Sequence, residues 1–131
     1  MPSYQVSEAA RLLGVSPDTV RRWVDDGRVQ ATRLASGRRD IEGRDLARLA
    51  ASIAAAPDPA HGDLASTRNR FLGLVTAVQR DSVMTQVDLV CGRFRVVSLI
   101  SREAADELGL EPGVIAVASI KATNVAVELP R

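Results

Sequence analysis

The two halves of this 131-residue chain carry different hydrophobic patterns. In the first half, apolar residues recur every three or four positions, which is the period of amphipathic helices. In the second half, apolar and polar residues alternate, as they do in strands that bury one face. The segment 54–66 between them contains two prolines and a glycine and follows neither period. We therefore predict two domains, 1–56 and 66–131, joined by a linker at 57–65.

Two short helices separated by a three-residue turn predict a helix-turn-helix in the first domain. The first helix runs from a cap at Ser7 to Gly14, and the second begins at Ser16 with Pro17 in its first turn. The second helix displays a hydroxyl and two guanidinium groups, on Thr19, Arg21 and Arg22. Such side chains reach phosphates and guanine edges in a major groove, so double-stranded DNA is a predicted partner.

A hairpin is predicted over 28–39, followed by a third helix over 43–55. Three arginines surround the hairpin turn: Arg33, Arg38 and Arg39. This arrangement is typical of a basic wing that rests on the DNA backbone or in the minor groove. The alternative is an ordinary solvated face, because four aspartates lie close by in the sequence: Asp18, Asp25, Asp26 and Asp40.

Five strands and one short helix are predicted in the second domain. The strands are expected near 72–76, 83–89, 94–100, 114–120 and 125–129, and the helix runs from a cap at Ser101 to Gly109. This set fits a small, closed or nearly closed, OB-like barrel. The predicted fold class is therefore α+β, with a mainly helical winged helix-turn-helix followed by a five-stranded barrel.

Composition adds three expectations. The net charge of +1 gives no overall nucleic-acid signal, so the local arginine clusters carry the DNA prediction. Domains of this size bury little surface alone, which favours a homo-oligomer. Cys91 is the only cysteine, and the sequence contains neither a secretory leader pattern nor an apolar run of membrane-spanning length. We therefore expect a cytoplasmic protein.

Three places in the second domain suit a tetrahedral oxyanion. Ser66, Thr67 and Arg68 precede the first strand and supply hydroxyls, backbone N–H groups and a guanidinium. Ser101 begins a helix, whose free N–H groups favour an anion. Lys121, the only lysine, is followed by Ala122 in a turn with several possible donors. Each place also has an ordinary explanation as linker, helix cap or surface lysine.

The first domain resembles a known family. The sequence YQVSEAARLLGVSPDTVRRWVDDGRVQATRLASGRRDI, within about residues 4–50, is similar to the MerR/excisionase type of winged helix-turn-helix. The resemblance implies DNA contacts from Ser16, Thr19, Arg21, Arg22, Arg38 and Arg39. The long dimerising helix of full MerR regulators is missing, so dimerisation would have to come from elsewhere.

The second domain resembles the molybdenum-pterin-binding (Mop, or TOBE) domain over about residues 64–130. The similarity rests on STRNRFLGLVTAV, LISREAADELGLEPG and SIKATNVAVEL, in that order. It implies binding of molybdate, with tungstate also possible, and no metal other than molybdenum in its oxyanion. The implied ligands are Ser66, Thr67, Arg68, Ser101, Lys121 and Ala122. In this family, anion sites form between subunits.

The leading hypothesis is a molybdate-responsive transcriptional regulator, similar in logic to ModE-type regulators. The alternative is an intracellular molybdate carrier or store whose DNA head has no regulatory role. A nucleic-acid-binding barrel is disfavoured because only Phe71 and Phe94 could stack on bases. No enzyme is expected, since His61 lies in the linker and Cys91 has no histidine near it in sequence.

Overall fold

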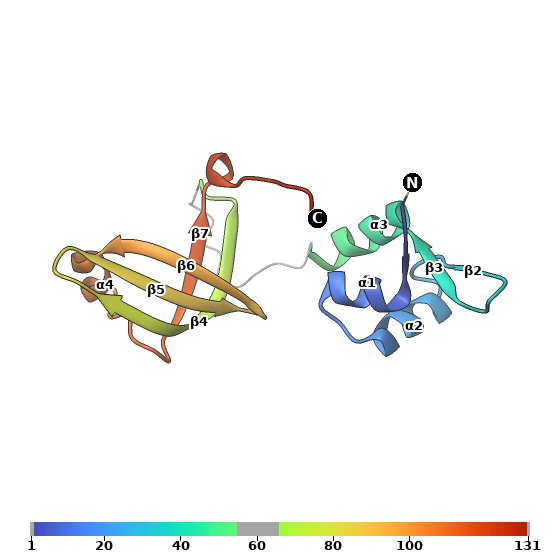
Figure 1. Cartoon of the computed structure of the whole chain (residues 1–131), viewed down its shortest axis with the longest axis horizontal. Helices are drawn as coiled ribbons and strands as arrows, with labels where there is room; N and C mark the ends of the chain where they lie inside the picture. Colours follow the sequence, from blue (N-terminus) through green and yellow to red (C-terminus); the bar gives the residue numbers. More distant parts are fainter. Residues whose placement is uncertain (1, 55–65, 131) are drawn as a thin grey trace. The chain divides into compact units, whose positions relative to one another are not determined.

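The computed structural model describes residues 2–54 and 66–130. The chain divides into two compact units, Met1–Pro57 and Asp58–Arg131 (Figure 1). The linker predicted at 57–65 lies outside the described residues. Within the described ranges, no helix is both long and apolar enough to cross a membrane.

The N-terminal unit consists of three helices and a small antiparallel sheet. The helices are α1 (Val6–Leu13), α2 (Pro17–Asp25) and α3 (Gly43–Ala54), and the strands are β1 (Ser3–Gln5), β2 (Thr32–Arg33) and β3 (Arg39–Glu42). The strand order is β1-β3-β2, so the predicted hairpin is the β2–β3 pair. Gly14 ends α1 with a φ of 70°, a conformation that glycine adopts without steric cost.

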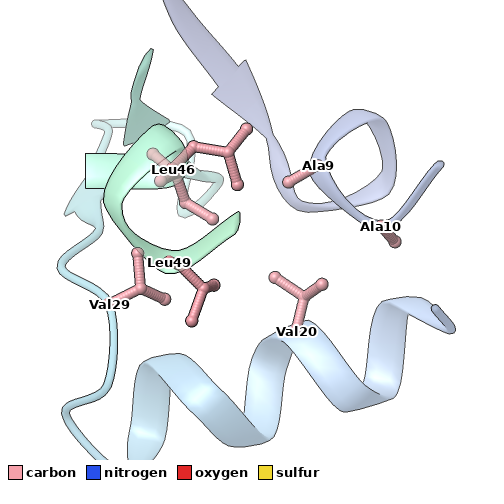
Figure 2. Close-up of a cluster of buried hydrophobic side chains, with 7 residues drawn as sticks. Ala9, Ala10, Val20, Val29, Leu46 and Leu49 are labelled. Atoms are coloured by element: carbon pink, nitrogen blue, oxygen red, sulfur yellow. The ribbon is translucent and has the colours of Figure 1, made fainter. Parts of the chain in front are cut away.

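The helices of this unit pack around a common aliphatic core (Figure 2). Its buried side chains come from all three helices, the segment after α2 and β3: Ala9, Ala10, Val20, Val29, Ile41, Leu46 and Leu49. Trp23 packs against this core rather than projecting from it. The predicted helix-turn-helix is thus confirmed, with its second helix fixed by burial of Val20 and partial burial of Trp23.

The C-terminal unit is a curled antiparallel sheet with one helix. Its elements are β4 (Asn69–Arg80), β5 (Met84–Cys91), β6 (Phe94–Ser101), α4 (Arg102–Glu107), β7 (Ile115–Ile120) and the 3-10 turn η1 (Ala122–Asn124). The strand order is β6-β5-β4-β7. The inner face and α4 enclose the core: Val75, Val87, Leu89, Cys91, Ala105 and Leu110.

The predicted fifth strand at 125–129, and with it the closed barrel, is wrong for the single chain. Residues 125–130 form no strand, and the side chains of Val127 and Leu129 are 90% and 89% exposed. β6 and β7 therefore remain edge strands, and the sheet is a half-barrel. Alternation indicates that a segment can form a half-buried strand, but it does not say which sheet edge supplies the partner.

The sheet curls along the pairing of β4 with β5. The register of the two strands shifts between Val75 and Ala77, which marks a bulge. Near the bulge, a Cβ atom on Gly73 would lie 2.5 Å from Cys91 Sγ and 2.8 Å from the Val90 carbonyl oxygen. Only glycine allows this close approach, and it lets the two strands bend around the core.

Arg80 at the end of β4 holds the helix side of the half-barrel in place. Its Nε donates to Asp106 Oδ1 of α4 at 3.1 Å, and its Nη2 donates to the Leu110 carbonyl oxygen at 2.8 Å. The same Nη2 lies 3.1 Å from a carboxylate oxygen of Glu111. These contacts fix α4, and with it Ser101, at the Arg80 end of the sheet.

Candidate DNA interface and anion site

Two of the predicted DNA-contacting residues also build the start of α2. Ser16 Oγ accepts the backbone N–H of Thr19 at 3.1 Å, and the two side-chain oxygens lie 2.8 Å apart. Pro17 occupies the first turn, where its missing N–H costs nothing. This cap fixes where the helix begins, so that Arg21 and Arg22 both project from its exposed face.

Three of the predicted contact arginines have aspartate partners. Arg21 pairs with Asp18 at 2.6 Å, Arg38 with Asp40 at 3.2 Å, and Arg39 with Asp25 at 2.9 Å. Arg22 and Arg33 are exposed and form no ion pair within the part of the chain that the structure describes. The cluster therefore combines features of both interpretations, a charged solvated face and a set of free cations.

The arginine contacts also join elements that are separate in the sequence. The Arg39–Asp25 pair connects β3 to the last residue of α2, so it links the wing hairpin to the predicted reading helix. Arg21, Arg38 and Arg39 line one cleft together with Arg33. The helix and the wing thus present a continuous basic surface.

Two of the three predicted anion-binding groups meet at one end of the sheet. Asn69, the first residue of β4, is the cross-strand partner of Ile120, the last residue of β7, and its side-chain amide donates to the Ile120 carbonyl oxygen at 3.1 Å. The segment before β4 and the turn after β7 are consequently neighbours. They carry Ser66, Thr67 and Arg68 on one side and Lys121 and Ala122 on the other. All but Thr67 are exposed.

Ser101 lies at the opposite end of the sheet. It pairs with Met84 at the start of β5, close to the end of β4 at Arg80, and its Oγ caps α4 by accepting the Ala104 N–H at 3.1 Å. A strand rises about 3.3 Å per residue, so the length of β4, measured along the strand, is about 36 Å. A single chain therefore does not bring the six predicted ligands together. Figure 1 shows α4, which follows Ser101, far from the end of β7 that precedes Lys121.

The surroundings of Ser101 in one chain are acidic. The hollow beside it is lined by Arg102 and by three carboxylates, Glu103, Asp106 and Glu107. Arg102 Nε lies 3.7 Å from Asp106, so its charge is largely offset. An oxyanion at Ser101 would need cations from elsewhere.

Of the two side chains weighed above for catalysis, only Cys91 lies among the described residues. Cys91 ends β5 with a buried thiol, 3.7 Å from the Phe71 carbonyl oxygen. His61 lies outside the described residues. Within 2–54 and 66–130, no cluster of three or more His, Cys, Asp or Glu side chains could hold a metal ion.

Comparison with known proteins identifies both units. Residues 65–127 match the TOBE domain model, and residues 5–41 match that of the MerR family regulatory proteins. Molybdenum-pterin-binding protein 3 of Clostridium pasteurianum is 36% identical over 63 residues, which cover 47% of this chain and 93% of that protein. The chain belongs to the TOBE family. Its N-terminal unit, called the MerR unit below, is a MerR-family helix-turn-helix, so both sequence resemblances are confirmed.

Two longer proteins share the TOBE unit. Molybdenum-pterin-binding protein MopA of Rhodobacter capsulatus is 37% identical over 79 residues, which cover 60% of this chain but only 29% of MopA. The solved structure of the cytoplasmic molybdate-binding protein ModG, with molybdate bound, has 38% identity and a TM-score of 0.50. That match covers 53% of this chain and 50% of ModG. The similarity to these relatives is thus confined to part of their length.

Proposed function

We propose that this protein is a cytoplasmic, molybdate-responsive DNA-binding regulator. The observation that carries the proposal is the presence of a MerR unit and a TOBE unit in one chain. The relatives of the TOBE unit include proteins that bind molybdate or molybdenum-pterin. Both families are typically non-enzymatic, and the protein acts by binding. A carrier or store would need no DNA-reading head.

The MerR unit binds double-stranded DNA with α2 in the major groove and the β2–β3 hairpin on the backbone. The contacting side chains are Ser16, Thr19, Arg21, Arg22 and Arg38, and Arg39 lies beside Arg38 on the same basic surface. Arg22 supports this assignment best, because it is exposed on α2 and forms no ion pair with a carboxylate of the described residues. Arg21 is also available, since its surface pair with Asp18, whose side chain is 93% exposed, contributes little stability.

The TOBE unit binds molybdate, or tungstate of the same charge and similar shape, between two copies of the chain. Ser66, Thr67, Arg68, Lys121 and Ala122 come from one copy, and Ser101 comes from the other. The separation of these groups along β4 and the acidic surroundings of Ser101 support a shared site. A two-fold axis that places the two ends of the sheet against each other creates two equivalent sites.

The half-barrel supports the same assembly. β6 and β7 offer unpaired edges, and the exposed residues 125–130 carry alternating apolar side chains at Val125, Val127 and Leu129. A second copy buries this apolar surface and pairs backbone groups that one chain leaves to water. Molybdate in the shared site stabilises one arrangement of the two chains, and with it one spacing of the two DNA heads.

Calorimetric titration of the full chain with molybdate, with sulfate as control, tests the anion site. We expect molybdate to bind and sulfate to bind much more weakly. Lys121→Ala removes the only lysine, and Ser101→Asp keeps a good helix cap while adding a charge that repels the anion. Each should abolish binding without lowering the melting temperature. Ser101→Asn, which also caps the helix but adds no charge, should weaken binding less than Ser101→Asp.

Co-expression of the two defective chains tests whether the site is shared. In a mixed dimer of Lys121→Ala and Ser101→Asp chains, one of the two sites receives both defects and the other receives neither. Random pairing then restores about a quarter of the wild-type binding capacity. Zero recovery in confirmed mixed dimers would place all ligands in one chain and contradict the shared site.

A further inference from the structure

A basic cleft lies on the MerR unit between the start of α1, α2 and the β2–β3 hairpin. Its volume is about 380 Å³, and four of the eight residues that line it are arginines: Arg21, Arg33, Arg38 and Arg39. None of these eight residues is acidic. The cleft is therefore suited to an anionic group.

The four arginines differ in how far their charge is already compensated. Arg21, Arg38 and Arg39 each pair with an aspartate that lies outside the cleft lining. The side chain of Arg39 is only 23% exposed in its pair with Asp25. Arg33 is exposed and has no ion pair within the described chain. It is the one guanidinium of the cleft whose charge is uncompensated there.

The register of the hairpin explains why Arg39 has an aspartate partner and Arg33 has none among the described residues. Arg33 of β2 and Arg39 of β3 are direct cross-strand partners, so their side chains leave the same face of the hairpin. Like charges in that position repel each other. Asp25 at the end of α2 neutralises Arg39, which relieves the repulsion and leaves Arg33 to the solvent.

We propose that Arg33 is the phosphate-binding residue of this cleft and holds one backbone phosphate of the DNA. Asp25 and Arg39 form a fixed pair that positions the hairpin against α2, so Arg39 is a positioning residue rather than a DNA contact. The proposal rests on the proposed DNA-binding function. Of the arginines around the hairpin turn, Arg33 thus holds the phosphate, whereas Arg39 positions the hairpin.

The test measures binding of the full chain to labelled duplexes as a function of salt concentration. One duplex is selected by the protein from a random-sequence pool, and the other is unrelated to it. Arg33→Ala should weaken binding to both duplexes equally, by roughly fivefold to tenfold in 0.1 M salt, and reduce the slope of log affinity against log salt by about 0.9. Arg44→Ala is the matched control, because Arg44 is an exposed arginine of α3 outside the cleft, and it should change affinity less than twofold.

The positioning role is tested by a second matched pair, Asp25→Asn and Asp26→Asn. Both remove one negative charge next to the end of α2, so both raise affinity for the unrelated duplex. Only Asp25→Asn releases Arg39, and it alone should steepen the salt slope, by up to about 0.9, and lower the ratio of selected to unrelated affinity. Melting curves establish that all four variants are folded.

The outcomes separate this proposal from the proposed function. If the wild-type chain binds DNA but Arg33→Ala and Arg44→Ala behave alike, the phosphate site is overturned and the DNA-binding function stands. If Asp25→Asn and Asp26→Asn behave alike, the positioning role of Arg39 is overturned. If the wild-type chain binds no duplex, both the proposed function and this inference fail.

Discussion

The two units differ in how completely each buries its own apolar side chains. In the described residues of the MerR unit, Leu12 and Ile53 are the large hydrophobic residues that remain exposed. In the TOBE unit, every strand of the sheet carries at least one: Phe71, Leu72 and Leu74 on β4, Val90 on β5, Phe94, Val97 and Leu99 on β6, and Ile115 on β7. The MerR unit therefore closes its core within one chain, whereas the TOBE unit does not.

The exposed residues of the TOBE unit are not scattered. Leu74 is the direct cross-strand partner of both Val90 and Ile115, so three exposed apolar side chains form a row across β5, β4 and β7. Leu72 extends the row along β4. A continuous apolar surface of this kind marks an interaction site. The comparison shows that one half of the chain buries its own apolar side chains, whereas the other half leaves an apolar surface of the kind that partners cover.

The largest effect is expected from substitutions in the C-terminal segment, residues 125–130. Val127→Asp combined with Leu129→Asp places two charges on the surface that a second copy would bury, so the protein should become monomeric by light scattering and lose molybdate binding. Leu12→Asp is the control, because Leu12 is 65% exposed on the MerR unit. It should leave the mass unchanged. An unchanged mass in the double variant would contradict the role of the segment in assembly.

Gly73→Ala should destabilise the TOBE unit selectively. The new Cβ would meet Cys91 Sγ and the Val90 carbonyl oxygen at distances that no relaxed contact allows, so we expect a loss of about 3 kcal/mol in the unfolding free energy of that unit. Denaturant unfolding, followed by a signal from each unit separately, measures this loss of unfolding free energy. Adding Cys91→Ala should restore only part of the loss, because the backbone contact at 2.8 Å remains. Full restoration would show that the thiol alone causes the clash.

Thr85→Val should stabilise the TOBE unit by about 1 kcal/mol. The Thr85 side chain is fully buried on the inner face of β5, and its hydroxyl has no hydrogen-bond partner within the described residues. Replacing an unsatisfied hydroxyl by a methyl group removes its desolvation penalty at nearly constant shape. Thr76→Val is the control, since the Thr76 hydroxyl is exposed and donates to the Asp88 carbonyl oxygen at 3.3 Å. Lower stability of Thr85→Val would mean that the hydroxyl has a partner after all.

The smallest expected effect is the loss of stability of the TOBE unit at low pH. Backbone N–H groups of Met84 and Val83 donate to Asp81 and lower the pKa of its carboxyl below the usual 3.8, and Gln86 and Arg95 lower the pKa of Asp88 in the same direction. A carboxyl with a depressed folded-state pKa stabilises the fold above its unfolded pKa, and this contribution disappears as pH falls through the folded value.

Melting of the TOBE unit should therefore shift to lower temperature as pH falls below 3.8. Asp81→Asn should lower stability slightly at neutral pH and flatten the acid dependence. Ser82→Asn, in the same turn, should leave that dependence unchanged. Identical acid profiles for wild type and Asp81→Asn would remove Asp81 as a cause.

The sequence was most informative where the signal is local. The cap at Ser16, the stop at Gly14 and the cap at Ser101 each depend on one or two neighbouring residues, and these three helix ends lie where the pattern predicts. The predicted cap at Ser7 is wrong, because Gln5 caps α1 together with Glu8. β1 was missed because three residues are too few to show a period, and it exists only through its pairing with β3.

The features that the sequence could not predict depend on distant partners. The alternation at 125–129 suggests a strand, but in the single chain this segment pairs with neither edge of the sheet, β6 or β7. Similarly, the motifs around Ser66, Ser101 and Lys121 could be found one by one, whereas their distribution over two ends of the sheet follows only from the register of β4. The aspartate that holds Arg39 lies 14 positions away, so spacing alone did not connect them.

The most direct test of a molybdate-responsive DNA-binding protein is the affinity of the full chain for its selected duplex with and without saturating molybdate. We expect molybdate, but not sulfate, to change that affinity by a factor of about 5 to 150, the usual range of coupling between two sites. The Lys121→Ala chain should bind the duplex with the unliganded affinity under both conditions. Equal wild-type affinities with and without molybdate would contradict the regulatory account and leave a DNA-binding head and an anion-binding half-barrel that act independently.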